Sequence, residues 1–325
     1  MLLNRPVARS FLSFGAVIVI VSVTIDPFIQ LTVGKQNRIL YVEDSSAQIS
    51  YAKRYSKVQG ADGNTYASTH VDANFALKSA VFYGVSQPDT LVSQQIRRSC
   101  PSDNCTWEPF QSLAICSTCA DLSENGGVEQ ANLTEYRLPN GLILNNPDDS
   151  DLLLMTGLGT SDQSQSLSFI NRDTLIWSMA LMKVDNDTSP PVTAVESGLW
   201  YCVNEYNSSV ENGDLSEVFT TISANDFNVS QAAVYSISEF MSATFTQTTN
   251  VNGTKKGMQI NAFATNLSGI AYGPTVMEVL YQSKDLSATF AALAKSTTNT
   301  IRENSDGGLI AAGKAGISHT LIQVH

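Results

Sequence analysis

Three stretches of the chain carry apolar residues at helical spacing. Asp72 can cap a first helix that Gly84 would end, and its apolar positions are Ala73, Ala76, Leu77, Ala80 and Val81. A second helix is expected to start near Asp285 and to bury Leu286, Phe290, Leu293, Ala294, Thr297 and Ile301. A third covers residues 230–245, with Val234, Ile237, Met241 and Phe245 on one side. These stripes are more typical of core helices than of partner-binding grooves.

Runs rich in β-branched and aromatic residues, bounded by turn residues, predict strands. They cover residues 176–184, 199–203, 217–222, 258–263 and 317–324. Strands and helices do not alternate regularly along the chain, which disfavours a doubly wound parallel sheet. We therefore expect an α+β fold, in which a largely antiparallel β-rich domain carries a few amphipathic helices.

The most apolar segment lies near the N-terminus. Residues 11–25 contain no charge, and Arg5 and Arg9 precede them. Fifteen helical residues span about 22 Å, less than the bilayer core of about 30 Å, so flanking residues must contribute and the predicted membrane segment is 11–31. A cleaved signal peptide and a buried core helix are the alternatives, but no Ala-x-Ala cleavage site follows. With a retained anchor, residues 1–10 are cytoplasmic and residues 32–325 form an extracytoplasmic domain.

Composition limits the partners more than the fold. The hydrophobic class makes up 43% of the 325 residues and the charged class 15%, so the chain can bury a core. The formal net charge of -11 argues against nucleic acid as a partner, because phosphate binding needs a basic face. Three histidines and five cysteines leave little for a histidine-rich metal site.

Asn-x-Ser/Thr sequons fit a translocated domain. They occur at Asn104, Asn132, Asn186, Asn207, Asn228, Asn252 and Asn266. Chance gives about four to five sequons at this composition, so their number is only a mild excess. Their position carries more weight, because all seven lie beyond the apolar segment. We expect these asparagines to be N-glycosylation acceptors.

Four of the five cysteines form a cluster with C-x4-C-x10-C-x2-C spacing. They are Cys100, Cys105, Cys116 and Cys119. Such a cluster can bind zinc, carry out redox chemistry or form two disulfides. An oxidising compartment favours disulfides, and no strand–helix context for a thioredoxin-type site is visible. We expect a disulfide-stapled loop with the four paired mostly among themselves.

Several motifs make the chain similar to a known family. They are the Ile25-Asp26-Pro27-Phe28 run, the Asn104-Cys105-Thr106-Trp107 block, the Cys116-Ser117-x-Cys119-Ala120-Asp121 block and the Leu199-Trp200-Tyr201-Cys202-Val203-Asn204 run. Together they resemble a large fungal family of integral membrane proteins of unknown function. The resemblance implies a transmembrane helix leading into a glycosylated ectodomain, and it implies no activity.

The chain departs from the family pattern in three places. Ser102-Asp103 stands where the family usually has Thr-Gly, and Ser197 stands where a cysteine usually precedes Cys202 by five residues. Cys202 is therefore expected to be a buried free thiol, or to pair with a cluster cysteine and leave another unpaired. Family members usually continue into another membrane helix, so the resemblance implies a truncated product or a single-anchor variant.

No catalytic motif is complete. Residues 308–315 approach a phosphate-binding loop, but Ala315 lacks the hydroxyl that would hold magnesium, and a flexible turn is favoured. Asp148, Asp149 and Asp151 can form a carboxylate pair or contribute to calcium binding, although a solvated loop is the simpler interpretation. We assign no catalytic, cofactor-binding or metal-binding residue and expect no cofactor.

The sequence thus predicts a membrane-anchored, N-glycosylated ectodomain in the secretory pathway or at the plasma membrane. Its one predicted partner is the lipid bilayer, through residues 11–31, and a protein or glycan partner is left open. A non-catalytic surface, receptor-like or scaffolding role is favoured. The alternative is an extracellular hydrolase that uses paired carboxylates.

Overall fold

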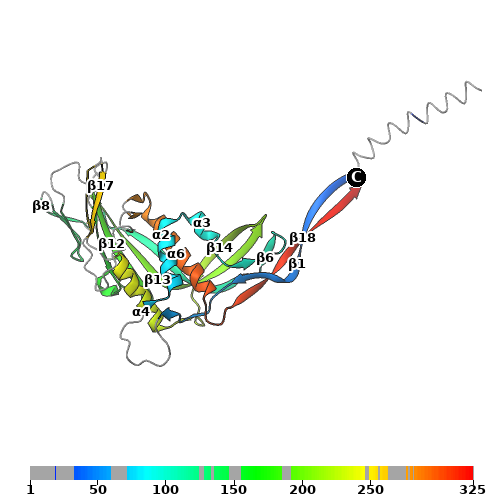
Figure 1. Cartoon of the computed structure of the whole chain (residues 1–325), viewed down its shortest axis with the longest axis horizontal. Helices are drawn as coiled ribbons and strands as arrows, with labels where there is room; N and C mark the ends of the chain where they lie inside the picture. Colours follow the sequence, from blue (N-terminus) through cyan, green and yellow to red (C-terminus); the bar gives the residue numbers. More distant parts are fainter. Residues whose placement is uncertain are drawn as a thin grey trace, which may run out of the picture.

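A nine-stranded antiparallel sheet is the main feature of the computed structural model (Figure 1). The structure describes residues 33–59, 72–123, 128–132, 135–145, 155–184, 192–245, 249–254, 257–262, 279–280 and 282–324, together with Val19 and Val276. The hydrogen-bonded path runs through β11 (Met155–Thr160), β12 (Leu175–Val184), β13 (Val192–Glu211), β6 (Cys105–Trp107), β18 (Ile310–Val324), β1 (Val33–Ser50) and β5 (Arg98–Ser99). β7 (Phe110–Asp121) and β14 (Asp214–Ile222) also pair with β13.

β13 organises the sheet because its 20 residues pair with four other strands. One edge contacts β12 and then β14, while the other contacts β7 and then β6. From residue 192 to 196 the buried side chains have even numbers, and from residue 197 to 203 they have odd numbers, as at Leu199 and Tyr201. From residue 204 to 210 they have even numbers again, as at Tyr206 and Val210. The buried face therefore changes along the strand, as expected for a strongly twisted sheet.

The other described strands form four small sheets outside the main sheet. They are β2 (Arg54–Tyr55) with β15 (Asn228–Val229), β3 (Val58–Gln59) with β4 (Asp72–Ala73), β8 (Glu129–Asn132) with β9 (Glu135–Arg137) and β10 (Ile143–Asn145), and β16 (Thr249–Thr254) with β17 (Gly257–Ala262). The β2–β15 pair is parallel.

Helices cover the largest core cluster. α4 (Gln231–Phe245) and α6 (Leu286–Glu303) pack on the sheet, while α2 (Phe75–Ser86) and α3 (Asp89–Ser93) pack against α6. A 3₁₀ turn covers Gln163–Gln165. Trp177 of β12 lies at the centre of this cluster, with its ring 5.0 Å from that of Phe245 and 6.4 Å from that of Phe290. Thr298 of α6 accepts a hydrogen bond from the backbone N–H of Ile115 on β7. α6 thus also shields an edge of the sheet.

The three predicted helices exist, and one of them differs in detail. α6 begins after Asp285, whose carboxylate accepts from the N–H of Ala288, as predicted. The first helix is capped by Asn74 instead of Asp72, and Gly84 lies inside it. A Cβ atom at Gly84 would lie 2.6 Å from the Cα of Leu293, so this glycine permits the close crossing of α2 and α6.

β1 and β18 extend from the body as a two-stranded ribbon, blue and red in Figure 1. Their register runs from the Val33–Val324 pair to the Asp44–Gly313 pair. β6 reaches β18 only at residues 313–315, so the outer part has no third described strand. At about 3.3 Å per residue the twelve paired residues of β1 span roughly 40 Å. Four consecutive apolar side chains in this part, from Ile39 to Val42, are exposed.

The expected α+β class is wrong, because the fold is mostly β. The described residues form eighteen strands and four α-helices. The cysteine cluster, expected as a stapled loop, lies largely on β6 and β7, and most of residues 308–315 belong to β18 instead of a flexible turn. A transmembrane helix was also part of that expectation. No helix among the described residues is long and apolar enough to cross a membrane, and of residues 11–31 only Val19 is described.

Candidate functional site

One of the two disulfides lies within the cysteine cluster, as expected, and the other does not. Cys100 bonds to Cys105, and Cys116 bonds to Cys202, with Cα–Cα distances of 5.8 Å and 5.9 Å. Cys119 keeps a free thiol and is half-buried. Cys202 is therefore not the free cysteine. The second alternative holds, in which Cys202 pairs with a cluster cysteine and leaves another one unpaired.

Strand geometry explains this pairing. Cys116 and Cys119 are three residues apart on β7, so their side chains point to opposite faces of the sheet. Cys116 lies next to Cys202 across the β7–β13 ladder, while Cys119 lies directly opposite Ser197, and its sulfur contacts the serine hydroxyl. Burial raises the pKa of the Cys119 thiol, although its hydrogen bond to Ser197 opposes the shift. This thiol is therefore a weak nucleophile.

The Cys100–Cys105 loop packs on the tip of the β13–β14 hairpin. The two-residue turn of this hairpin consists of Asn212 and Gly213, whose φ angles of 54° and 87° are typical of an Asn-Gly hairpin turn. The N–H of Gly213 donates to the carbonyl of Asp103 over 2.9 Å. The N–H of Asn212 donates to the side-chain oxygen of Asn104 over 3.3 Å. The disulfide thus holds the loop in a shape that receives the hairpin tip.

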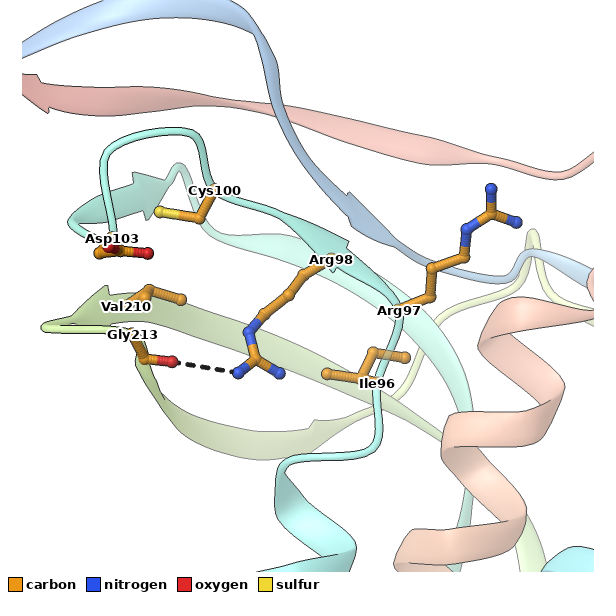
Figure 2. Close-up of a pocket in the computed structure, with 7 residues that line it drawn as sticks. All are labelled: Ile96, Arg97, Arg98, Cys100, Asp103, Val210 and Gly213. Atoms are coloured by element: carbon orange, nitrogen blue, oxygen red, sulfur yellow. Dashed lines mark hydrogen bonds between the residues drawn. The ribbon is translucent and has the colours of Figure 1, made fainter.

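A surface hollow of about 370 Å³ lies where the loop, the hairpin tip and the segment before β5 meet (Figure 2). Its lining residues are Ile96, Arg97, Arg98, Cys100, Asp103, Val210 and Gly213. Figure 2 shows the Arg98 guanidinium extending toward Gly213, while the Arg97 side chain points away. The Arg98 group donates to the carbonyl and side-chain oxygens of Gln94 and to the carbonyl of Gly213 over 3.0–3.2 Å. All three acceptors are neutral, so these bonds hold the cation without cancelling its charge.

A second hollow, of about 330 Å³, shares Arg97 and Arg98 with the first. Its other walls come from residues 48–50 of β1, from Ser99 on β5, from Glu303 at the end of α6 and from residues 308–310. The Glu303 carboxylate accepts from the backbone N–H of Arg97 over 2.6 Å. Burial raises the pKa of Glu303, and its interactions with Arg97 and Arg302 oppose the shift. Each hollow thus combines arginine with a carboxylate, Asp103 in the first and Glu303 in the second, and neither lining contains a histidine or a free thiol.

A buried carboxylate on β13 has a structural role. The buried carboxylate of Glu196 accepts from Ser166 and Ser178 hydroxyls and from the backbone N–H groups of Leu167 and Ser168, so it fastens a loop to β13. Among the described residues no group of three or more His, Cys, Asp or Glu is placed to hold a metal ion. The predicted candidates at positions 148, 149 and 151 lie outside the described residues.

The predicted glycosylation acceptors differ in accessibility. Asn207 on β13 and Asn228 on β15 are exposed. Asn104 is half-buried, and its amide nitrogen donates to the carbonyl of Ser102. Asn132 and Asn252 lie on strands β8 and β16, and the acceptors at 186 and 266 lie outside the described residues.

Comparisons with protein-family models, with curated proteins and with solved structures found no match to this chain. The candidate site therefore rests on its own geometry. Sequence reasoning missed Arg97 and Arg98, since neither belongs to a motif and the hollows are assembled from segments far apart in the chain.

Proposed function

We propose that this protein is a membrane-tethered, extracytoplasmic glycoprotein with a non-catalytic, receptor-like role. The observation that carries the proposal is the β1–β18 ribbon. β1 starts at Val33, directly after the apolar segment 11–31, and leads about 40 Å to the sheet and helices. A segment inserted in lipid would therefore hold the folded body away from the bilayer surface.

The two disulfides support the compartment. Disulfides persist in oxidising spaces and are rare in the cytosol. The Cys116–Cys202 bond joins residues 86 positions apart. Because it closes a long loop, it contributes to the stability of the whole sheet. The exposure of Asn207 and Asn228 is compatible with glycan attachment in the same space.

The hollows beside Arg97 and Arg98 support a binding role. Each offers guanidinium donors at the surface, and such groups suit carboxylate, sulfate or phosphate on a ligand. A binding role rests on these arginine side chains at the two hollows.

Glycosidase treatment of the full chain, expressed in a eukaryotic secretory system, tests the proposal. We expect a clear decrease in apparent mass after treatment. Asn207→Gln and Asn228→Gln variants should each remove one glycan. Asn104→Gln should change the apparent mass least, because the Asn104 amide nitrogen already donates a hydrogen bond to the carbonyl of Ser102. A chain that carries no glycan when expressed from its own N-terminus would contradict the proposed compartment.

A further inference from the structure

β14 is an edge strand in the part of the chain that the structure describes. There it pairs with β13 alone, from the Glu211–Asp214 pair to the Val203–Ile222 pair. Edge strands usually carry lysine, proline, a bulge or an inward-pointing charge that prevents pairing with another chain, and of these β14 has only the inward charge of Glu217. β14 has the sequence DLSEVFTTI and contains neither lysine nor proline, and its register with β13 has no shift.

The hydrogen-bonding pattern identifies which backbone groups face outward. In an antiparallel hairpin closed by a two-residue turn, alternate residues direct their N–H and C=O groups away from the partner strand. Here these residues are Leu215, Glu217, Phe219 and Thr221. The side chain of Gln94 supports this assignment, because it accepts from the N–H of Leu215 and donates to its carbonyl over 3.2 Å and 3.1 Å.

The Gln94 side chain thereby satisfies the outward backbone groups of Leu215, as a neighbouring strand would. The open part runs from Glu217 to Thr221, and its midpoint is Phe219. A second copy running antiparallel can pair Phe219 with Phe219 and Glu217 with Thr221, which satisfies the outward groups of both copies. On the other face of the sheet, Val218 of one copy then lies opposite Thr220 of the second copy. The open edge is therefore complementary to itself.

The side chains of this segment suit a second copy. Val218 is 69% exposed and Phe219 is 48% exposed, although both are large and apolar. The only charge between Leu215 and Ile222 is Glu217, and Arg302 of the same copy neutralises it through two bonds of 3.0 Å. Two copies can approach at this edge without like charges facing each other, despite the net charge of -11 on each chain.

From this symmetry we propose that the protein forms a homodimer in which β14 pairs antiparallel with β14 of a second copy, centred on Phe219. The two nine-stranded sheets become one continuous sheet. The interface is small, so the dimer is weak in dilute solution and becomes more populated where copies are concentrated, as on a membrane. Asn207 lies opposite Val218 across the hairpin, so a glycan there projects from a face of the sheet, one strand away from the paired edge.

Cysteine pairs test the register directly. The full chain is purified in detergent micelles in a Cys119→Ser background, which removes the native free thiol. In the proposed pairing, residue 218 of one copy faces residue 220 of the other. A mixture of Val218→Cys and Thr220→Cys chains should therefore form an intermolecular disulfide at least tenfold faster than either chain alone. A matched Ser216→Cys and Thr220→Cys mixture, which breaks the register, should stay at the level of the single variants.

Charge variants test the dimer without relying on cysteine. Val218→Lys with Thr220→Lys places lysines opposite each other and should weaken association at least tenfold in sedimentation experiments. Val218→Lys with Thr220→Glu places opposite charges together and should retain it. Both positions are exposed, so neither variant disturbs the core. The proposal is wrong if the two variants associate equally, if the wild-type chain is monomeric at the highest concentration reached, or if the mismatched cysteine mixture cross-links as well as the matched one.

Discussion

Arg302 and Glu217 form an ion pair in which the guanidinium is wholly buried and the carboxylate is nearly so. The two terminal nitrogens of Arg302 each lie 3.0 Å from a carboxylate oxygen, and the side chains are 0% and 8% exposed. The remaining Nε donates to the carbonyl of Ser50, and the guanidinium lies 4.3 Å from the centre of the Tyr206 ring. One side chain of α6 thus connects β1, β13 and β14.

Breaking this pair should destabilise the protein strongly. An Arg302→Met substitution leaves the Glu217 carboxylate without its cation in a poorly solvated site, and we expect a loss of about 3–5 kcal/mol in the free energy of unfolding. Adding Glu217→Leu should recover part of that loss, because the buried charge disappears. Urea unfolding followed by tryptophan fluorescence measures both variants.

A matched control is the exposed pair of Lys295 and Asp89. The Lys295 nitrogen lies 3.0 Å from the Asp89 carboxylate, with side chains 26% and 56% exposed. Lys295→Met should cost less than about 1 kcal/mol. Equal losses for the Lys295 and Arg302 variants would contradict the role assigned to the buried pair.

A second cross-strand disulfide should form in a Ser197→Cys variant. Ser197 is directly opposite Cys119 in the β7–β13 ladder, and the two side chains already touch. Because Cys116–Cys202 already closes nearly the same loop, the added stability should be only about 1 kcal/mol. Mass spectrometry after alkylation under denaturing conditions should find one free thiol in the wild type and none in the variant. Two free thiols in the variant would rule out the β7–β13 register.

Stability should decrease at alkaline pH because of buried tyrosines. Burial raises the pKa of Tyr55 to about 12, and it also raises the pKa of Tyr201 and Tyr206. In the unfolded chain a tyrosine ionises near pH 10. The stabilising contribution of the neutral Tyr55 is thus complete below about pH 10 and is lost as the pH rises toward 12, by about 2 kcal/mol.

Urea midpoints between pH 8 and 11.5 measure this decrease. Tyr55→Phe should make the midpoint less dependent on pH, and it should cost little at pH 8, because the Tyr55 hydroxyl has no hydrogen-bond partner among the described residues. Tyr83→Phe on α2 is the matched control. A pH dependence that is unchanged in Tyr55→Phe would show that this hydroxyl does not contribute.

Gly84→Ala should destabilise the protein although alanine favours helices. The added Cβ would lie 2.6 Å from the Cα of Leu293 and 2.9 Å from the carbonyl oxygen of Ala292, so α2 and α6 must separate. This cost should exceed the gain in helix propensity of about 1 kcal/mol, giving a net loss of about 1–3 kcal/mol. Thermal unfolding compares it with Ser86→Ala on the exposed end of α2. A more stable Gly84→Ala variant would show that the two helices are not in close contact.

Helix periodicity was sufficient to locate α4 and α6. Both helices bury one stripe of residues against the sheet, and a period of 3.6 residues is a local signal that a sequence displays directly. Asp285 illustrates this, because it was recognised as the start of α6 and its side chain caps that helix. The five predicted strand segments all overlap observed strands, but most are shorter than the strand they belong to, and the long strands β1 and β7 were not predicted.

Pairing between distant segments could not be read from the chain. Cys116 bonds to Cys202 because of the register between β7 and β13, and that register depends on all the contacts of a twelve-residue ladder. The cysteine-rich run was interpreted as a loop since its turn residues and short spacings hide the alternation of β7. The hollows beside Arg98 likewise combine three segments whose proximity arises only from folding.

Protease protection of sealed microsomes tests the central claim most directly, that residues beyond the apolar segment lie outside the cytoplasm. Because β18 pairs with β1, both ends of the ribbon should be on the same side of the membrane. With tags at the two termini of the full chain, trypsin should remove the N-terminal tag and leave the C-terminal tag intact until detergent opens the vesicles. Loss of the C-terminal tag from intact vesicles would contradict the account.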